Sequence, residues 1–174
     1  MKLRSKKIVI LVEHHYQDME VWVPYYRLLE EGAKVIFAGT GSAESYSGKY
    51  GYPVHAEKKA KDLRAKDFDA VIIPGGWAPD FLRRDPSVLK FVKEMDERNQ
   101  VIGAICHAGW VLASAGVAKG RRLTAFSAIK DDLIHAGARF VDQEVVVDGN
   151  LVTSRKPDDL PAFMREIVLA LQKR

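Results

Sequence analysis

Short apolar runs alternate with segments of helical period along the chain. Four runs rich in β-branched residues predict buried strands, at residues 7–12, 34–39, 70–76 and 101–106. Between them, apolar positions recur with helical spacing over residues 18–31 and 86–97. Strands that alternate with helices are typical of a mostly parallel sheet covered by helices. The pattern therefore predicts an α/β fold.

Local signals refine these elements. Pro24 lies inside the first predicted helix and indicates either a kink or a later start. The apolar stripe of that helix is expected to consist of Trp22, Tyr25, Tyr26, Leu28 and Leu29. Asp85 and Pro86 form an N-cap and first-turn pair, after which Val88, Leu89, Phe91, Val92 and Met95 are expected to face the sheet. Turn residues between short β-branched runs predict hairpins over residues 45–56 and 144–154, and a last helix is expected to begin near residue 157.

Length and composition indicate one domain, residues 1–174. The chain is 47% hydrophobic and 29% charged, which suits a soluble protein that buries a core of its own. Membrane insertion is not expected, because no apolar run approaches the roughly 18 residues of a spanning helix. The apolar stretch near the N-terminus meets Glu13 and two histidines instead of a cleavage site, so we expect a strand there and not a signal peptide.

Cysteine and charge restrict the class further. Cys106 is the only cysteine and has no partner for an internal disulfide, which indicates a cytoplasmic protein. The 27 Lys and Arg residues exceed the 23 Asp and Glu residues by four and are scattered, so no dedicated nucleic-acid surface is expected. Five histidines and one cysteine show no ligand spacing, and we expect no metal site.

Three stretches follow predicted strands and should meet at one edge of the sheet, where ligands bind in open parallel sheets. They are the turn from Glu13 to Glu20, residues 74–77, and Cys106 with His107. His15 and Trp77 would then line a pocket at this edge, although Trp77 also suits a core. The roles of His14 and His15 are left open.

Cys106 stands between an apolar strand and a helical segment, with Ala104 and Ala108 as small neighbours. This arrangement resembles a nucleophile elbow, a sharp strand-to-helix turn that presents a reactive side chain. A sulfur at a helix N-terminus is expected to have a lowered pKa. The alternative is a buried, inert cysteine.

Gly75 and Gly76 allow the backbone to approach a ligand closely, and the Gly76 and His107 amides would form an oxyanion hole. Glu20 at the start of the first helix would reach the same place. A carboxylate beside the sulfur would raise the pKa of the thiol, so a useful Glu20 must be protonated or must act as an acid and base. Alternatively, Glu20 only complements the helix dipole.

Four segments together carry a family resemblance that spans essentially the whole chain. They are QDMEVWVPYYRLLEEGAKV (17–35), PGGWAPD (74–80), AICHAGWVLASAGV (104–117) and residues 123–163. In this order and spacing they resemble the PfpI family of the parkinsonism-associated deglycase superfamily. The resemblance implies a flavodoxin-like three-layer sandwich of the class I glutamine amidotransferase-like type.

The resemblance also implies roles for individual residues. Cys106 would be the nucleophile, His107 its neighbour in a triad, and Glu20 the acid that hydrogen-bonds the sulfur. Asp80, where the family more familiarly has Glu, would be contributed to His107 by an adjacent subunit. A homodimer or hexamer is therefore expected, without a cofactor.

Three activities remain open at this point. Cys106 could add to glyoxal, methylglyoxal or their adducts on protein amines, as a glyoxalase or deglycase does. A Cys106-His107-Asp80 triad could cleave peptides, but we expect a histidine adjacent in sequence to have difficulty in folding back onto the sulfur. Third, Cys106 could serve as a non-enzymatic oxidation sensor or belong to a chaperone. Relative to the family, Gln17 and His15 make the first loop less acidic, and Ala108 and Gly109 replace the usual Gly-Pro pair, which puts the substrate in question.

Overall fold

The computed structural model describes residues 2–174. Its strands are β1 (Lys7–Val12), β2 (Lys34–Gly39), β3 (Ser45–Ser47), β4 (Pro53–His55), β5 (Lys58–Lys59), β6 (Ala70–Ile73), β7 (Val101–Ile105), β8 (Arg122–Leu123), β9 (Arg139–Phe140), β10 (Val145–Asp148) and β11 (Leu151–Ser154). Its α-helices are α1 (Asp18–Glu30), α2 (Ala78–Leu82), α3 (Pro86–Glu97), α4 (Gly109–Ser114), α5 (Lys130–His135) and α6 (Leu160–Gln172). Short 3-10 turns occupy Ala60–Asp62, Ala65–Asp67, Cys106–Ala108, Ser127–Ile129 and Pro157–Asp159.

A seven-stranded sheet in the order β10-β11-β7-β6-β1-β2-β5 forms the centre of the molecule. Its strands pair in parallel except for β10 and β11, which form an antiparallel hairpin at one edge. The central strands β1, β6 and β7 are almost wholly buried, as expected for a parallel sheet covered on both faces.

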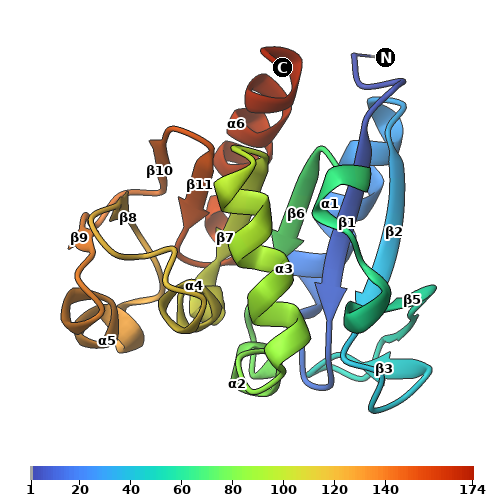
Figure 1. The fold of residues 1–174 in the computed structure, drawn as a ribbon, viewed down its shortest axis with the longest axis horizontal. Coiled ribbons are helices and arrows are strands. Elements are labelled where there is room, and N and C mark those ends of the chain that lie inside the picture. The colour runs from blue at the N-terminus through green and yellow to red at the C-terminus, as the bar shows by residue number, and fades with distance from the viewer. Residues whose placement is uncertain (1) are drawn as a thin grey trace.

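Helices cover both faces of this sheet. In Figure 1, α3 crosses the front of the sheet, whereas α1 and α6 lie behind it and contact each other. The arrowheads of β1, β6 and β7 point toward the lower edge, where α2, α4 and the β3-β4 hairpin gather. The predicted three-layer α/β sandwich is confirmed, and the carboxyl ends of its strands converge on one edge.

The predicted elements agree closely with the observed ones. The first two predicted strands match β1 and β2, both predicted hairpins form, and Asp85 caps α3 by accepting a hydrogen bond from the Ser87 amide. The third strand ends at Ile73, because Pro74 has no amide to continue the ladder. The fourth ends at Ile105, because Cys106 turns out of the strand.

The prediction for α1 needs two corrections. The helix begins at Asp18, so the alternative of a later start is wrong. The predicted apolar stripe is also wrong in part: Val21, Pro24 and Leu28 are buried, whereas Tyr26 is 59% exposed. Aromatic content misled the prediction, because half of the large side chains of α1 face away from the sheet.

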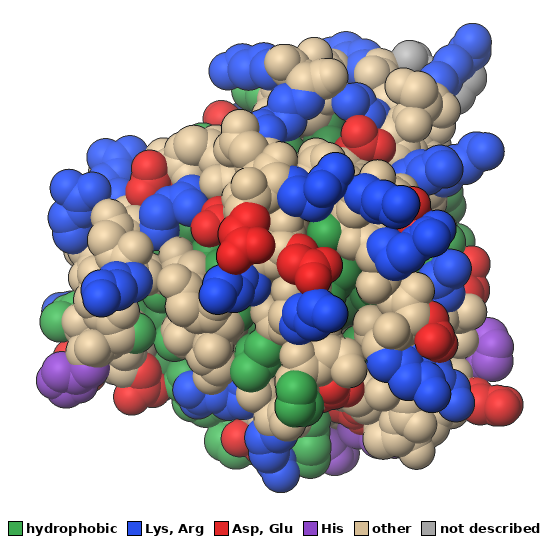
Figure 2. Space-filling model, viewed as in Figure 1, with side chains coloured by type: hydrophobic (Ala, Val, Ile, Leu, Met, Phe, Trp, Pro, Cys, Tyr) green, Lys and Arg blue, Asp and Glu red, His purple; other side chains and the backbone are tan. Residues whose placement is uncertain are grey.

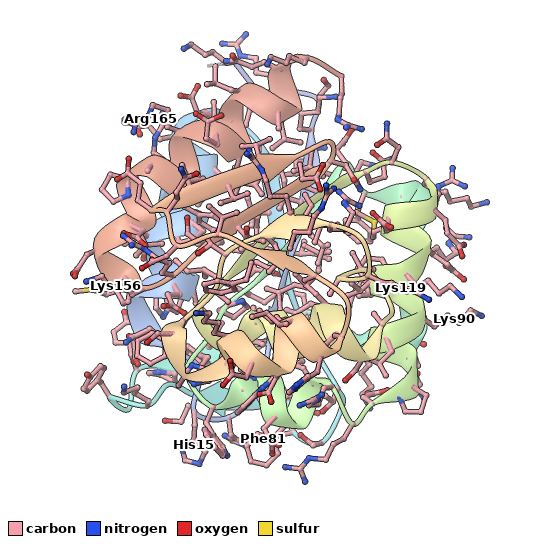
Figure 3. All side chains as sticks on the ribbon, turned by 90° about the vertical axis from the view of Figure 1, so that its left-hand side faces the viewer. His15, Phe81, Lys90, Lys119, Lys156 and Arg165 are labelled. Carbon is pink, nitrogen blue, oxygen red and sulfur yellow. The ribbon has the colours of Figure 1, made fainter. Side chains whose placement is uncertain are left out.

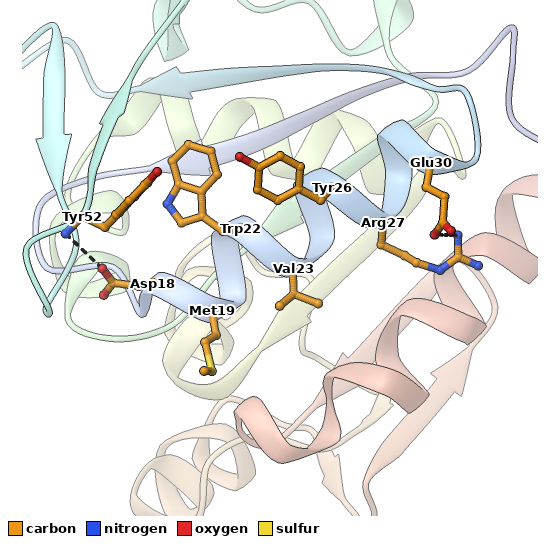
Figure 4. A pocket seen from close by; sticks show the side chains of 8 residues that line it. All are labelled: Asp18, Met19, Trp22, Val23, Tyr26, Arg27, Glu30 and Tyr52. Atoms are coloured by element: carbon orange, nitrogen blue, oxygen red, sulfur yellow. Dashed lines mark hydrogen bonds and ion pairs between the residues drawn. The ribbon is translucent and has the colours of Figure 1, made fainter.

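The outer face of α1 lines a wide hollow, which we call the α1 groove. Figure 4 shows its lining residues, Asp18, Met19, Trp22, Val23, Tyr26, Arg27, Glu30 and Tyr52. Its volume is about 730 Å³. An ion pair between Arg27 and Glu30 closes one end, and the Tyr52 amide donates to Asp18 at the other.

Surface charge is mixed on the face seen in Figure 2, where Lys and Arg side chains are scattered among Asp and Glu. No helix within residues 2–174 is long and apolar enough to cross a membrane.

Candidate active site

Cys106 occupies a sharp turn between β7 and the helical segment that leads into α4. Its φ of 62° lies in the left-handed region, which non-glycine residues rarely adopt. The turn Cys106–Ala108 follows at once, and the Cys106 carbonyl accepts a hydrogen bond from the Phe126 amide at 3.2 Å. This backbone has the conformation of a nucleophile elbow, in which strain fixes the direction of one side chain.

His107 lies against the sulfur of its neighbour. Its Nδ1 is 3.2 Å from Cys106 Sγ, so the expectation that an adjacent histidine cannot fold back is wrong. The left-handed backbone of Cys106 explains the error, because it turns the two side chains to the same side. Phe126 stacks on the imidazole with centroids 5.1 Å apart, and Trp110 packs edge-on against it. Burial lowers the pKa of His107, which favours a neutral ring that can accept a proton.

Glu20 approaches the sulfur from α1. Its side chain is completely buried, and one carboxyl oxygen accepts a hydrogen bond from the Gly75 amide at 2.7 Å. Within the described chain the other oxygen, Oε1, has no hydrogen-bond partner. Burial raises the pKa of Glu20 from 4.5 to about 8, so the carboxyl group is mostly protonated at neutral pH. This is the protonated form that the sequence required of a useful Glu20.

The thiol behaves differently from the sequence-based expectation. Burial, together with a charged Glu20, raises the pKa of Cys106 to about 12, although the Gly76 and His107 amides act in the opposite direction. The predicted lowering by a helix N-terminus is therefore wrong, because the desolvation of a nearly buried sulfur is larger. Protonation of Glu20 removes one of the two causes.

Two glycines make room for this arrangement. A Cβ atom at Gly75 would lie 2.5 Å from Cys106 Cβ and 2.6 Å from a Glu20 carboxyl oxygen. At Gly76 it would lie 2.4 Å from the His15 carbonyl oxygen, and the φ of 73° is itself left-handed. Gly75 thus separates Glu20 from Cys106 and is not among the residues that line the adjoining cavity, as had been predicted for it.

A cavity of about 510 Å³ opens in front of Cys106, and we call it the Cys106 cavity. Its lining residues are His15, Gln17, Lys49, Gly76, Trp77, Cys106, His107, Phe126, Lys156 and Pro157. His15 and Trp77 therefore line it as predicted, and Trp77 is half exposed. His15 lies beside Phe81 at the lower edge of the molecule, with ring centroids 6.4 Å apart (Figure 3).

Asp80 lies on α2, away from the thiol of its own chain. Its carboxylate pairs with Arg84 one turn later. No contact joins Asp80 to His107 within residues 2–174.

Several lining residues were missed in the sequence. Phe126, Lys49 and Lys156 come from three separate connections, and no motif links them to Cys106. His14, whose role was open, accepts a hydrogen bond from the Ser47 amide and packs on Tyr46, so it anchors the β3-β4 hairpin. In the described part of the chain, no cluster of three His, Cys, Asp or Glu residues is arranged to hold a metal ion.

Comparisons with known proteins agree with this geometry. The DJ-1/PfpI family profile matches residues 6–170. A deglycase of Pyrococcus abyssi is 42% identical over 166 residues, which cover 95% of this chain and 99% of that protein. YraA of Bacillus subtilis, provisionally named a cysteine protease, is 43% identical over 162 residues, 93% of this chain and 96% of its own.

The fold comparison gives the same answer. The crystal structure of Drosophila melanogaster DJ-1beta superposes with a TM-score of 0.90 at 29% identity, covering 98% of this chain and 92% of that one. Sequence profile, relatives and fold all extend over nearly the whole chain. The chain belongs to the DJ-1/PfpI family.

Proposed function

We propose that this protein is a cysteine-dependent enzyme that converts 2-oxoaldehydes such as methylglyoxal, or their adducts on amines, to 2-hydroxy acids. One observation carries the proposal: Cys106 Sγ lies 3.2 Å from a neutral-favouring His107 ring, beside the buried, protonatable Glu20. The P. abyssi relative, named a deglycase, supports it. The chain would act as one domain inside the cell and without a cofactor.

His107 and Glu20 divide the movement of protons in this proposal. His107 Nδ1 is placed to take the thiol proton as the sulfur attacks, which a thiol with a raised pKa requires. Glu20 in its protonated form can donate to the sulfur or to a substrate oxygen. The Gly76 and His107 amides, which lower the pKa of the thiol, would also stabilise an oxyanion that forms beside it.

The reaction would proceed in three steps. The sulfur bonds to the aldehyde carbon and the carbonyl oxygen takes up a proton, which gives a hemithioacetal. A proton then leaves that carbon and another arrives at the neighbouring carbon, so the former aldehyde carbon is oxidised and the ketone carbon reduced, and a thioester results. Water hydrolyses the thioester to a 2-hydroxy acid and regenerates the thiol. The sum is 2-oxoaldehyde plus water, with no external oxidant.

An amine adduct would follow the same route after one extra exchange. The sulfur displaces the amine from the carbinol carbon, the C–N bond breaks, and the amine leaves with a proton. The repaired amine and the same hemithioacetal are the products of this step.

Peptide hydrolysis is a second candidate, and the distance from Sγ to Nδ1 favours it too. A thiol and an imidazole in contact are the core of a cysteine peptidase, and the YraA name points to that activity. We rank it second, because Asp80 is paired with Arg84 and within one described chain no carboxylate orients His107.

We further propose that the protein works as a homo-oligomer in which Asp80 of one copy orients His107 of another. Nδ1 is occupied by the sulfur, which leaves Nε2 of the ring to accept such a partner. Asp80 is partly exposed and lies on the short helix that follows the double glycine, which suits a contact between copies.

The test is turnover of methylglyoxal by the purified protein, followed by the appearance of lactate. We expect turnover by the wild type and a loss of at least about 1,000-fold in Cys106→Ala. Cys106→Ser, which keeps the size of the side chain, is the matched control and should be similarly inactive. Casein hydrolysis is measured in parallel. Lactate formation that survives in Cys106→Ala would exclude the mechanism, and casein hydrolysis without lactate would establish the second candidate.

A further inference from the structure

The lining of the Cys106 cavity has one sign of charge. Four of its ten residues, His15, Lys49, His107 and Lys156, carry basic side chains, and none is acidic. Glu20 lies behind Cys106, is fully buried and does not line the cavity. A substrate in this cavity therefore meets cationic groups without a neighbouring carboxylate.

Lys49 is held in place by its backbone. It lies in the turn between β3 and β4, where its amide donates to the Tyr16 carbonyl at 2.8 Å. Asp18 grips the same turn by accepting hydrogen bonds from the Tyr50 and Tyr52 amides at 3.0 and 3.2 Å. The turn thus presents Lys49 to the cavity from a fixed position, so that only the side chain needs to be ordered.

The charge of Lys49 is available to a ligand. Its ammonium group contacts the face of the Tyr50 ring at 5.2 Å, and no carboxylate within residues 2–174 forms a salt bridge with it. Its field reaches both Glu20 and His107, whose pKa values it lowers. Lys49 therefore acts electrostatically on the reacting groups although it is exposed.

Lys156 makes a weaker contribution. It extends from the connection between β11 and α6 and pairs with Asp158, its Nζ 3.0 Å from a carboxylate oxygen. Both side chains are well exposed, so solvent screens the pair and the lysine stays free to turn toward a ligand.

We propose that the Cys106 cavity selects substrates that carry an anionic group next to the electrophilic carbonyl, with Lys49 as the main specificity-determining residue and Lys156 as the second. The class is that of 2-oxoaldehydes bearing a carboxylate or phosphate a few bonds from the aldehyde. This inference rests on the proposed 2-oxoaldehyde chemistry for its substrate class. The proposed trans contact would compensate His107 by Asp80 and leave both lysines uncompensated.

The first experiment measures the anion preference without any enzymatic turnover. Cys106 is the only thiol, so its alkylation is unambiguous by mass spectrometry. Iodoacetate and iodoacetamide form the same sulfur–carbon bond and release iodide, but only iodoacetate is anionic. We expect the ratio of their rates to fall about fivefold in Lys49→Gln and further in Lys49→Gln/Lys156→Gln.

Three controls accompany this ratio. Lys90→Gln removes an exposed lysine on α3, on the opposite side of the molecule from Lys156 (Figure 3), and should leave the ratio unchanged. Lys49→Arg keeps the charge and should retain the ratio. Raising the ionic strength should reduce it in the wild type, because salt screens exposed charges. An equal ratio in wild type and Lys49→Gln would overturn the proposal.

The second experiment compares turnover of phenylglyoxal and 4-carboxyphenylglyoxal, which share the reacting group and differ by one carboxylate. We expect the ratio of their kcat/KM values to fall about fivefold in Lys49→Gln and to persist in Lys90→Gln. The ratio cancels any effect of Lys49 on the chemistry common to both.

The two experiments separate the two proposals. If neither glyoxal is turned over but the alkylation ratio depends on Lys49, the anion preference stands and the proposed function fails. If phenylglyoxal is turned over through Cys106 and neither ratio changes, the function stands and the anion preference fails.

Discussion

The two hollows of this molecule differ in the reverse order of their size. The α1 groove has a volume of about 730 Å³ and is lined at its centre by Met19, Val23 and Tyr26, which carry no reactive group. The Cys106 cavity is smaller, about 510 Å³, and contains the thiol and its imidazole. Convergent polar groups with shifted pKa values, and not volume, therefore indicate where chemistry takes place.

One helix contributes to both hollows. The inner face of α1 carries Glu20 to the sulfur, whereas its outer face carries the apolar residues of the groove. Substitutions on the two faces should have very different effects on turnover, although they lie within a single turn of each other. Three variants test this contrast.

Glu20→Gln is expected to have the largest effect. The amide keeps the shape and can still accept from the Gly75 amide, but it cannot exchange a proton at neutral pH. We expect kcat for methylglyoxal to fall about 100-fold. A kcat within twofold of the wild type would show that Glu20 is structural, and the inner face of α1 would then resemble the outer.

The same variant changes the dependence of stability on pH. Because the pKa of Glu20 is 4.5 when unfolded and about 8 when folded, the folded state retains a proton between these values that the unfolded state releases. The wild type therefore loses stability as the pH rises from 4.5 to 8. Glu20→Gln lacks this loss, so the difference in Tm between variant and wild type should increase with pH across that window. A constant difference would contradict the burial of a protonated carboxyl group.

Asp80→Asn is expected to have an intermediate effect, roughly tenfold on kcat, because a histidine loses its orienting carboxylate. The trans arrangement makes a sharper prediction for mixtures. Co-expressed Asp80→Asn and Cys106→Ala chains should regain activity, since each supplies what the other lacks. Mixed oligomers without any regained activity would exclude the contribution of Asp80 from a second copy.

Val23→Ser on the outer face should have the smallest effect. Val23 is 42% exposed, and its replacement should change the free energy of unfolding by about 0.5 kcal/mol or less. We expect kcat/KM for methylglyoxal to stay within about twofold, with Glu20→Gln as the matched variant on the inner face. A loss of tenfold or more would show that the groove serves the reaction and would erase the contrast.

The fold was largely predictable because its strands are buried on both faces. Continuous runs such as Ile8–Val12 must lie in a central strand, and the turn at Asp148–Asn150 has little choice but a hairpin. The α1 helix was harder, since Trp22, Tyr25 and Tyr26 are as apolar as any core residues. Only the packing of α1 on the sheet decides which of them faces solvent.

The candidate site was predictable where neighbours in sequence determine it. Cys106, His107 and the double glycine follow strands and were found from that position. Lys49 and Phe126 come from connections 57 residues before and 20 residues after Cys106, and no local pattern reports their approach. The direction of the thiol pKa was missed for a related reason, because desolvation depends on how completely the tertiary structure covers the sulfur.

The double glycine has a consequence for how this protein can diversify. Any side chain at Gly75 would have to occupy the space between Glu20 and Cys106, and any at Gly76 would collide with the backbone around His15. These two positions are closed to mutation, whereas Lys49 and Lys156 at the mouth can change without disturbing the core. Natural or laboratory evolution toward new substrates should therefore proceed through the rim of the cavity while its floor stays fixed.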